Sequence, residues 1–217
     1  MVNLSDISQS LQSGRVGETA ALIALAIKEN YSVDSIIKQG LIPGMYAVTD
    51  RYKRQEIFQP DLLVAERAMY RGIGILKAYL NAGNSMGKAA CTVVIGAVKG
   101  DRRDIEKRLT VLTMEGLGLR VIDLGTGVSP ERFIEAAIAE KAQVILCTAN
   151  LPAVMGQLKL VVNAAVSSGI RNSITIMVSG APVTEKYCRT IGADCYAKDT
   201  VAAVEMAESI CAGNCGT

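Results

Sequence analysis

The chain has 217 residues, half of them apolar, and its 23 basic and 21 acidic side chains leave a formal net charge of +2. This balance, with two Phe, seven Tyr and no Trp, argues against a phosphate-tracking groove or a base-stacking platform, so we expect no nucleic-acid partner. No stretch approaches the roughly 18 apolar residues of a membrane span. The first residues also lack the basic and apolar segments of a signal peptide, so we expect a cytoplasmic protein with no membrane partner.

The chain contains six cysteines and no histidine. Most of the cysteines stand in apolar or strand-like stretches, where a thiol packs as a small apolar side chain. The last two form a C-x-x-x-C pair, but nothing beside that pair completes a tetrahedral zinc site. We therefore expect no metal ligand, and free thiols at Cys91, Cys147, Cys188, Cys195, Cys211 and Cys215.

Residues 1–84 show only helical periodicity and predict a helical bundle domain. Breaks are expected at Gly14 and at Gly40–Gly44, and Pro60 suits the first turn of a long helix. The small, polar stretch 81–88 is typical of a linker. The longest apolar stripe at helical spacing consists of Leu62, Ala65, Met69, Ile73, Leu76 and Leu80.

Residues 89–217 alternate short apolar runs with amphipathic helices. Strands that are apolar on both faces are typical of a parallel sheet with helices on each side. We therefore predict a Rossmann-like (flavodoxin-like) α/β domain with a five-stranded parallel sheet. The expected strands are Cys91–Val98, Leu119–Leu124, Gln143–Thr148, Ser173–Ser179 and Ala193–Ala197.

In such a sheet, ligands bind outside the carboxyl ends of the strands, so the loops at that edge form the candidate site. The first loop does not read G-x-G-x-x-G, and G-x-x-x-x-G-K-[ST] occurs nowhere, which argues against dinucleotide and nucleoside triphosphate ligands. Ser129 and Pro130 are well suited simply to begin a helix. The loops of interest are Lys99–Asp104, Gly125–Pro130, Ala149–Pro152 and Gly180–Thr184.

Several short motifs follow one another along nearly the whole chain. They are G-L-I-P-G-M (Gly40–Met45), E-I-F-Q-P-D-L-L-V-A (Glu56–Ala65), V-K-G-D-x-x-D-I (Val98–Ile105), V-I-D-L-G (Val121–Gly125), G-A-P-V-T (Gly180–Thr184) and I-G-A-D-x-Y-A (Ile191–Ala197). In this order they resemble the corrinoid (cobalamin-binding) proteins of anaerobic methyltransferase systems, of the methanol, methylamine or methoxy type. The ordered set is far more specific than any single motif.

The resemblance implies a helical bundle followed by a Rossmann-like domain that holds a cobamide with its nucleotide tail extended into the sheet. In that family the loop after the first strand reads D-x-H-x-x-G, and its histidine is the lower cobalt ligand. Here Asp101 remains, Arg103 stands at the histidine position and Glu106 stands at the last glycine. A guanidinium has no lone pair to offer, so Arg103 cannot ligate the metal. We expect Asp101 to pair instead with Arg103 or Arg102.

The resemblance also implies which residues surround the cofactor, and it implies no catalytic side chain. Asp101 and Arg103 would lie beneath the corrin. Met45, Tyr46 and Phe58 of the bundle are candidates to shield its upper face, with plain core packing as the alternative. The expected cofactor-binding residues are Gly100, Asp101, Arg103, Asp104, Ile105, Glu106, Thr148, Leu151, Ser179, Gly180, Ala181 and Tyr196, with Thr148, Ser179 and Gly180 lining the tail slot and Tyr196 flanking the base.

Three functions stay open at this point. The first is a corrinoid carrier that holds cobalamin or another cobamide base-off, without a histidine ligand. Such a carrier shuttles a methyl group between a substrate-specific methyltransferase and a methylcorrinoid:acceptor methyltransferase, as a subunit in anaerobic one-carbon metabolism rather than a stand-alone enzyme. The second is a family member that no longer binds cobalamin, because Arg103 and Glu106 fill the mouth of the site, and that acts as a regulatory or partner-binding subunit. The third is an anion site formed by Arg102, Arg103 and Lys107 at a helix N-terminus.

Overall fold

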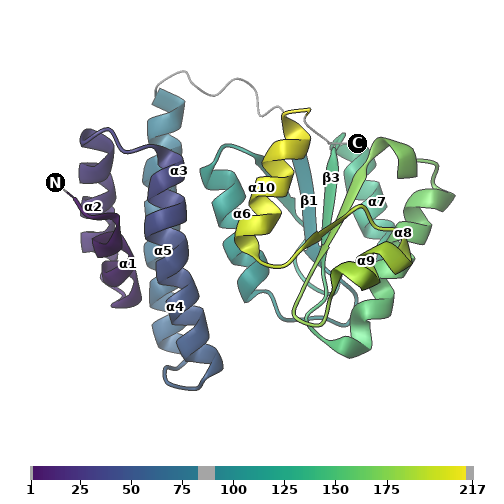
Figure 1. Cartoon of the computed structure of the whole chain (residues 1–217), viewed down its shortest axis with the longest axis horizontal. Coiled ribbons are helices and arrows are strands. Elements are labelled where there is room, and N and C mark those ends of the chain that lie inside the picture. Colours follow the sequence, from purple (N-terminus) through teal and green to yellow (C-terminus); the bar gives the residue numbers. More distant parts are fainter. Residues whose placement is uncertain (1, 83–90, 214–217) are drawn as a thin grey trace. The chain divides into compact units, whose positions relative to one another are not determined.

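The computed structural model describes residues 2–82 and 91–213, which fall into two compact units (Figure 1). The first unit holds helices α1 to α5, and the second holds the sheet and the helices around it. The expected linker 81–88 falls largely outside the described residues, so the domain limits at 84 and 89 stay predictions. Within 2–82 and 91–213, no helix is both long and apolar enough to cross a membrane.

Residues 2–82 of the first unit form helices and no strand, as the periodicity of the sequence predicts. Asn3 begins the first helix, because its side-chain oxygen accepts a hydrogen bond from the Ser5 N–H at 3.1 Å. Pro60 stands in the first turn of α5, and Gly14 lies between α1 and α2. The elements are α1 (Leu4–Gln12), α2 (Val16–Lys28), α3 (Val33–Ser35), a π-helical segment (Ile36–Leu41), α4 (Ile42–Lys53) and α5 (Gln59–Ala82).

The expected break at Gly40–Gly44 is wrong, because the chain stays helical from Val33 to Lys53. The two glycines serve close packing against α1 instead. A Cβ added to Gly44 would lie 2.9 Å from the Ser8 carbonyl oxygen, closer than side-chain atoms approach a backbone. The two glycines let this helical segment approach α1 closely. Glycines that indicate a helix break in the sequence therefore serve helix packing in the structure.

The second unit is built on a parallel sheet of five strands in the order β2-β1-β3-β4-β5, the flavodoxin-like arrangement that the sequence predicts. Its central strands are buried along their whole length, which explains their unbroken apolar runs. Each strand lies within its predicted run. The strands are β1 (Thr92–Ala97), β2 (Arg120–Asp123), β3 (Val144–Thr148), β4 (Thr175–Ser179) and β5 (Cys195–Ala197).

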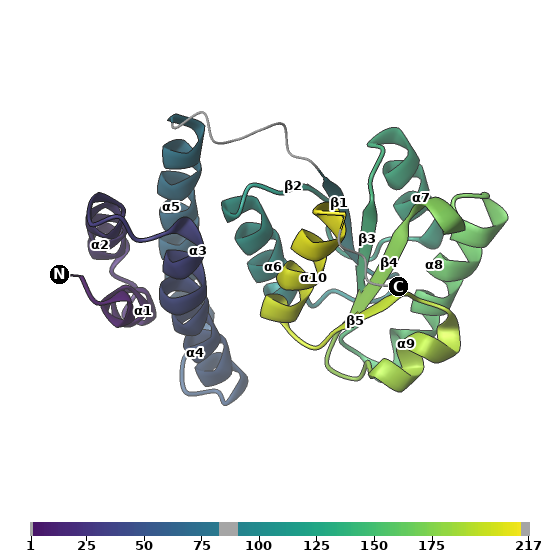
Figure 2. The same cartoon turned by 45° about the horizontal axis from the view of Figure 1, so that its top comes forward.

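Helices cover both faces of this sheet, with α6 and α10 on one face and α7, α8 and α9 on the other (Figures 1 and 2). Helix α7 begins as predicted, with Pro130 in its first turn and the Ser129 hydroxyl accepting the Arg132 N–H at 3.3 Å. The main apolar cluster contains Phe133 of α7 and Leu158 of α8. The helices are α6 (Ile105–Gly116), α7 (Pro130–Ala139), α8 (Met155–Ser167), α9 (Glu185–Ile191) and α10 (Thr200–Cys211).

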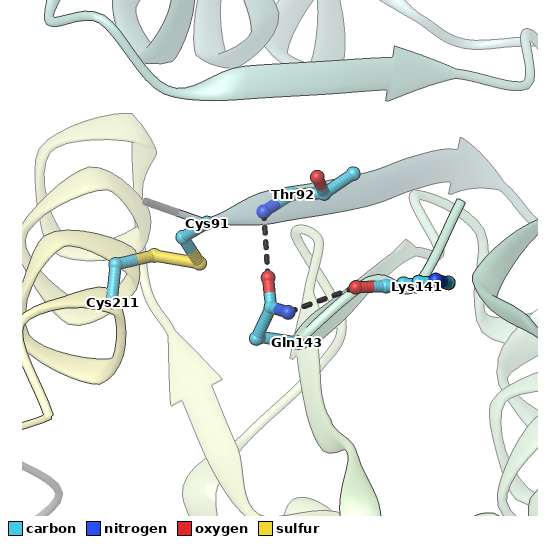
Figure 3. Close-up of a disulfide and its surroundings, with 5 residues drawn as sticks. All are labelled: Cys91, Thr92, Lys141, Gln143 and Cys211. Atoms are coloured by element: carbon cyan, nitrogen blue, oxygen red, sulfur yellow. Dashed lines mark hydrogen bonds between the residues drawn. A yellow bond between two sulfur atoms is a disulfide. The ribbon is translucent and has the colours of Figure 1, made fainter. Parts of the chain in front are cut away.

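A disulfide joins Cys91, just before β1, to Cys211, the last residue of α10 (Figure 3). The two residues are 120 positions apart in sequence, and their Cα atoms lie 5.2 Å apart. The expectation of free thiols at these two positions is therefore wrong, because the fold brings together residues whose spacing gave no sign of pairing. Cys215, four residues after Cys211, lies outside the described residues. Three other cysteines, Cys147, Cys188 and Cys195, form no disulfide with any described residue, in line with the expected thiols.

The disulfide predicts a specific thiol count. In denaturant, the air-oxidised protein should release two fewer equivalents of thionitrobenzoate than the reduced protein, and alkylation before digestion should leave a Cys91–Cys211 cross-linked peptide. Because the bond closes a long loop, the Cys91→Ser/Cys211→Ser variant should lose about 2–4 kcal/mol of unfolding free energy. Equal thiol counts before and after reduction would contradict the pairing.

The packing of α1 predicts opposite effects for two glycine substitutions. Gly44→Ala should lower the free energy of unfolding by about 1–3 kcal/mol, because the new methyl group meets the Ser8 backbone. Gly74→Ala is the matched control, since nothing lies within 4 Å of a Cβ at that position in α5. There the better helix propensity of alanine should raise stability by about 0.5–1 kcal/mol. Urea unfolding monitored by circular dichroism measures both, and equal signs would refute the packing argument.

Candidate functional site

The loop after β1 is organised around the carboxylate of Asp101, which is fully buried. One carboxylate oxygen accepts the Arg103 N–H at 2.9 Å, and the other accepts the Asn150 N–H at 2.6 Å. The expected pairing of Asp101 with the side chain of Arg103 or Arg102 is wrong, because backbone N–H groups occupy both oxygens. A buried carboxylate is stabilised well by such charge-assisted hydrogen bonds.

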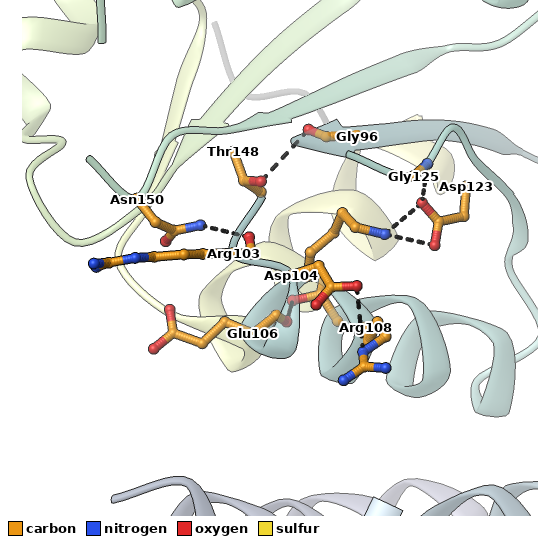
Figure 4. A network of polar contacts seen from close by, with 11 residues as sticks. Gly96, Arg103, Asp104, Glu106, Arg108, Asp123, Gly125, Thr148 and Asn150 are labelled. Atoms are coloured by element: carbon orange, nitrogen blue, oxygen red, sulfur yellow. Dashed lines mark hydrogen bonds and ion pairs between the residues drawn. The ribbon is translucent and has the colours of Figure 1, made fainter. Parts of the chain in front are cut away.

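Further hydrogen bonds join this loop to its neighbours at the carboxyl edge of the sheet. The Asn150 side-chain amide donates to the Arg103 carbonyl at 3.2 Å (Figure 4). The Gly127 N–H donates to the Asp101 carbonyl at 3.1 Å. Gly100 makes the turn that starts the loop, with a φ of +87° that favours glycine. The loops after β1, β2 and β3 are thus held together through one buried residue.

The charged side chains of this loop differ in how they are neutralised. Asp104 forms an ion pair with Arg108 at 3.5 Å, one turn further along α6. The guanidinium groups of Arg102 and Arg103 are exposed, and neither makes a hydrogen bond or ion pair with any described residue. Ile105 and Glu106 are half-buried in the first turn of α6. In Figure 4 the Arg103 side chain extends from the loop beside Asn150.

A narrow slot lies between α6, α10 and the carboxyl ends of β3 and β4, with a volume of about 10 Å³. That space is about enough for one water molecule. The hydroxyls of Thr110 on α6 and Thr200 on α10 are hydrogen-bonded at 2.9 Å and hold the two helices together across it. The slot is lined by Glu106, Lys107, Thr110, Leu146, Thr148, Asn150, Ser179, Gly180, Asp199, Thr200 and Ala203.

Four of the expected binding residues, Glu106, Thr148, Ser179 and Gly180, meet at this slot. Gly180 is required by the backbone, because its φ is +131° and a Cβ would lie 2.0 Å from the Ala149 carbonyl oxygen. Leu151 and Ala181 follow β3 and β4 in the loops at the same edge but are not part of the slot lining.

Tyr196, expected to flank the base, lies on the face of the sheet opposite the slot. In the sheet register it stands beside Val178, and it packs against the apolar cluster on the side of α7 and α8. The slot lies on the other face, where Ser179 pairs in register with Ala197. Side chains alternate between the two faces of a strand, so neighbouring residues such as Tyr196 and Ala197 point to opposite faces of the sheet. Tyr196 is therefore a half-buried residue on the opposite face, packed against the apolar cluster there.

Lys107 does not take part in an exposed anion site, contrary to the expectation from the sequence. The whole residue is only 2% exposed, and its ammonium donates to both carboxylate oxygens of Asp123, at 2.5 and 2.6 Å. Asp123 also accepts the Gly125 N–H at 2.9 Å. Lys107 stands at helical spacing from the buried Thr110 and Met114, and this signal would have placed it inside the fold.

The buried thiols near the strands are not available as anionic ligands. Burial raises the pKa of the Cys147 thiol on β3, and burial, with smaller contributions from neighbouring acidic groups, raises that of Cys188 to about 11. Both remain protonated at neutral pH and pack as small apolar side chains. Among the residues that the structure describes, no three histidine, cysteine or carboxylate side chains gather as a metal site.

The three bundle residues considered as a shield have different environments. Met45 is buried on α4, as core packing requires, and Tyr46 is half-buried. Phe58 is 73% exposed just before α5 and is the candidate that core packing does not explain.

The comparisons with known proteins agree over nearly the whole chain. Residues 4–77 and 91–205 each match a family model described as a B12 binding domain. The dimethylamine corrinoid protein of Methanosarcina barkeri is 32% identical over 96% of this chain and 97% of its own length. The solved monomethylamine corrinoid protein of the same organism superposes with a TM-score of 0.71 at 27% identity, covering 95% of this chain and 97% of that one. A chain of the methanol:cobalamin methyltransferase complex from Methanosarcina barkeri gives a TM-score of 0.60 at 26% identity, covering 95% of this chain and 78% of that one.

The pair of Lys107 and Asp123 predicts an asymmetric response to substitution. Asp123→Asn should lower the free energy of unfolding by about 3–5 kcal/mol, because it leaves a buried ammonium without a counter-charge. Lys107→Met should cost less, since the side chain of Asp123 is 33% exposed and water can reach it, whereas that of Lys107 is 1% exposed. Urea unfolding of both variants tests the order, and a larger loss for Lys107→Met would contradict it.

Proposed function

We propose that this chain, which belongs to the corrinoid proteins with B12 binding domains, is the methyl-carrying subunit of a corrinoid-dependent methyltransferase system. The observation that carries the proposal is the match of two B12 binding domain models, in order, to this chain. In agreement with it, Thr148, Ser179 and Gly180 meet at one slot at the carboxyl edge of the sheet. When bound, the cobalt of a corrinoid supplies the nucleophile that accepts a methyl group and later releases it.

The residues at the slot fit the nucleotide tail of a corrinoid in their chemistry. The Thr148 and Ser179 hydroxyls can donate to and accept from a polar tail, and Gly180 adds no bulk. Most affinity for a large ligand comes from burial of its surface, so such a slot contributes binding without a metal ligand. Entry of a tail requires α6 to part from α10, and hence the Thr110–Thr200 hydrogen bond to break.

The residues beneath the expected corrin do not fit imidazole ligation. The chain has no histidine, and the guanidinium at position 103 offers no lone pair. We therefore propose that the cobamide is held base-off and without a protein nitrogen ligand. Gly100, Asp101, Arg103, Asp104 and Ile105 would form the loop beneath it, with Leu151 and Ala181 in the neighbouring loops.

The likeness to relatives also supports the proposed partners. Those relatives include a dimethylamine corrinoid protein and a chain from a methanol:cobalamin methyltransferase complex. We propose a substrate-specific methyltransferase that loads the methyl group and a methylcorrinoid:acceptor methyltransferase that removes it. The cytoplasmic location stays a prediction from the sequence.

A regulatory subunit without cobalamin is the second candidate. The observation in its favour is the slot itself, which the Thr110–Thr200 hydrogen bond closes to about 10 Å³ and which the Glu106 side chain lines. Family members that keep glycine at position 106 would have neither the bulk nor the charge of a glutamate there. The two candidates differ in a single measurable property, the retention of a corrinoid.

The deciding experiment is to incubate the purified full chain with hydroxocobalamin, remove free ligand by gel filtration and record the visible spectrum of the protein fraction. The carrier should co-elute with about one corrinoid per chain and show a base-off spectrum. A folded preparation that elutes colourless would reject the carrier and favour the regulatory subunit.

A further prediction concerns the missing ligand. Arg103→His should restore imidazole coordination, because the backbone at position 103 is fixed by Asp101 and Asn150. The variant's spectrum should shift from the base-off form to a nitrogen-coordinated form, and acid should reverse that shift as the imidazole is protonated. Arg103→Gln is the control and should keep the base-off spectrum. Identical spectra for the two variants would show that position 103 does not face the metal.

A further inference from the structure

The backbone of Arg103 is fixed at a defined place on the carboxyl edge of the sheet. Its N–H donates to Asp101 at 2.9 Å, and its carbonyl accepts from the Asn150 side chain at 3.2 Å. Asp101 is fully buried and is itself tied to the backbone of Asn150. These hydrogen bonds therefore hold the backbone of Arg103, in the loop after β1, against the loop after β3 (Figure 4).

The backbone of Arg103 is held in place, whereas its side chain points to solvent. The Arg103 guanidinium is exposed and makes no hydrogen bond or ion pair with any residue in the described ranges. Asp101 accepts backbone N–H groups, and Asp104 pairs with Arg108. The third acidic residue of this segment, Glu106, lies half-buried in the first turn of α6 and lines the slot. Arginine stays protonated at any accessible pH, so the positive charge is permanent.

A fixed positive charge beside a metal favours the oxidation state in which the metal carries less positive charge. We infer that the Arg103 guanidinium raises the reduction potential of the bound corrinoid's cobalt(II)/cobalt(I) couple by its charge, apart from any effect of the missing imidazole. This inference rests on the proposed carrier function. It gives the replaced position a role of its own, since the guanidinium can support the reduced nucleophilic form although it cannot ligate the metal.

The reaction concerned is a one-electron step. Cobalt(II) takes one electron from a low-potential one-electron donor and becomes cobalt(I), with no proton transfer and no bond made to Arg103. The metal loses one positive charge, so the repulsion between the metal and the guanidinium decreases. The effect should weaken with added salt wherever water separates the two charges, because mobile ions screen exposed charges beyond about 8–10 Å at ordinary ionic strength.

The test is a redox titration of the corrinoid-loaded full chain with titanium(III) citrate and mediators, followed by the absorbance of cobalt(II) and cobalt(I). Arg103→Gln removes the charge and adds no ligand, whereas Arg103→Lys keeps the charge. Arg189→Gln, at a side chain 76% exposed in the last turn of α9, is the control for net charge. At a given potential, Arg103→Gln should lower the cobalt(I) to cobalt(II) ratio about tenfold, or about 59 mV for one electron, and raising salt should reduce that difference. The lysine variant and the control should stay near the unmodified protein.

Each outcome decides the inference. An unchanged midpoint in corrinoid-loaded Arg103→Gln would overturn it and leave the carrier function intact. Failure of the unmodified protein to retain hydroxocobalamin would overturn the carrier function and this inference together. If Arg103→Gln loses the corrinoid and the unmodified protein keeps it, the salt dependence of the unmodified protein is the test. Its cobalt(II)/cobalt(I) midpoint potential should fall as salt rises from 10 mM to 1 M. A constant midpoint potential would overturn the inference.

Discussion

The buried carboxylate of Asp101 is the constraint on which the site depends. Among the described residues it has no cationic partner, and backbone N–H groups from two loops satisfy its two oxygens. Because leaving a buried charge unpaired is costly, those two loops cannot separate without exposing or stranding the carboxylate. The loop after β2 joins them through the Asp101 carbonyl. One buried residue therefore joins the loops after β1, β2 and β3 at the carboxyl edge of the sheet.

The two sides of the candidate cofactor site differ in their chemistry. On the side of the slot, small hydroxyl side chains and Gly180 suit a polar tail. Beneath the expected corrin, the loop offers a permanently charged arginine and no nitrogen lone pair. Binding through the tail and electrostatic control from below are consistent with each other, since the first needs buried surface and the second needs only a fixed charge at a suitable distance.

The helices that border the slot are anchored at different points. The start of α6 is held by the ion pair of Lys107 with Asp123, and the end of α10 is held by the disulfide to Cys91. Between these anchors the helices meet at the Thr110–Thr200 hydrogen bond. A single neutral hydrogen bond contributes about 1 kcal/mol, less than the loss expected from breaking a long-loop disulfide or from leaving the buried ammonium of Lys107 without its counter-charge. If the nucleotide tail of a corrinoid enters the slot, the Thr110–Thr200 hydrogen bond is therefore the first of these three contacts to break.

The sequence by itself determined the order of helices and strands, the parallel sheet and the edge that carries the site, because apolar periodicity and loop chemistry are local properties. It also determined that the chain itself offers no imidazole ligand, since it has no histidine. Only the tertiary structure decided which face Tyr196 takes, that Lys107 is buried against Asp123, that Gly40 and Gly44 pack a helix rather than break one, and that Cys91 pairs with Cys211. The physical reason is common to these cases: strand register, helix-to-helix distance and long-range pairing join residues far apart in the chain, and no local pattern encodes which partner each will meet.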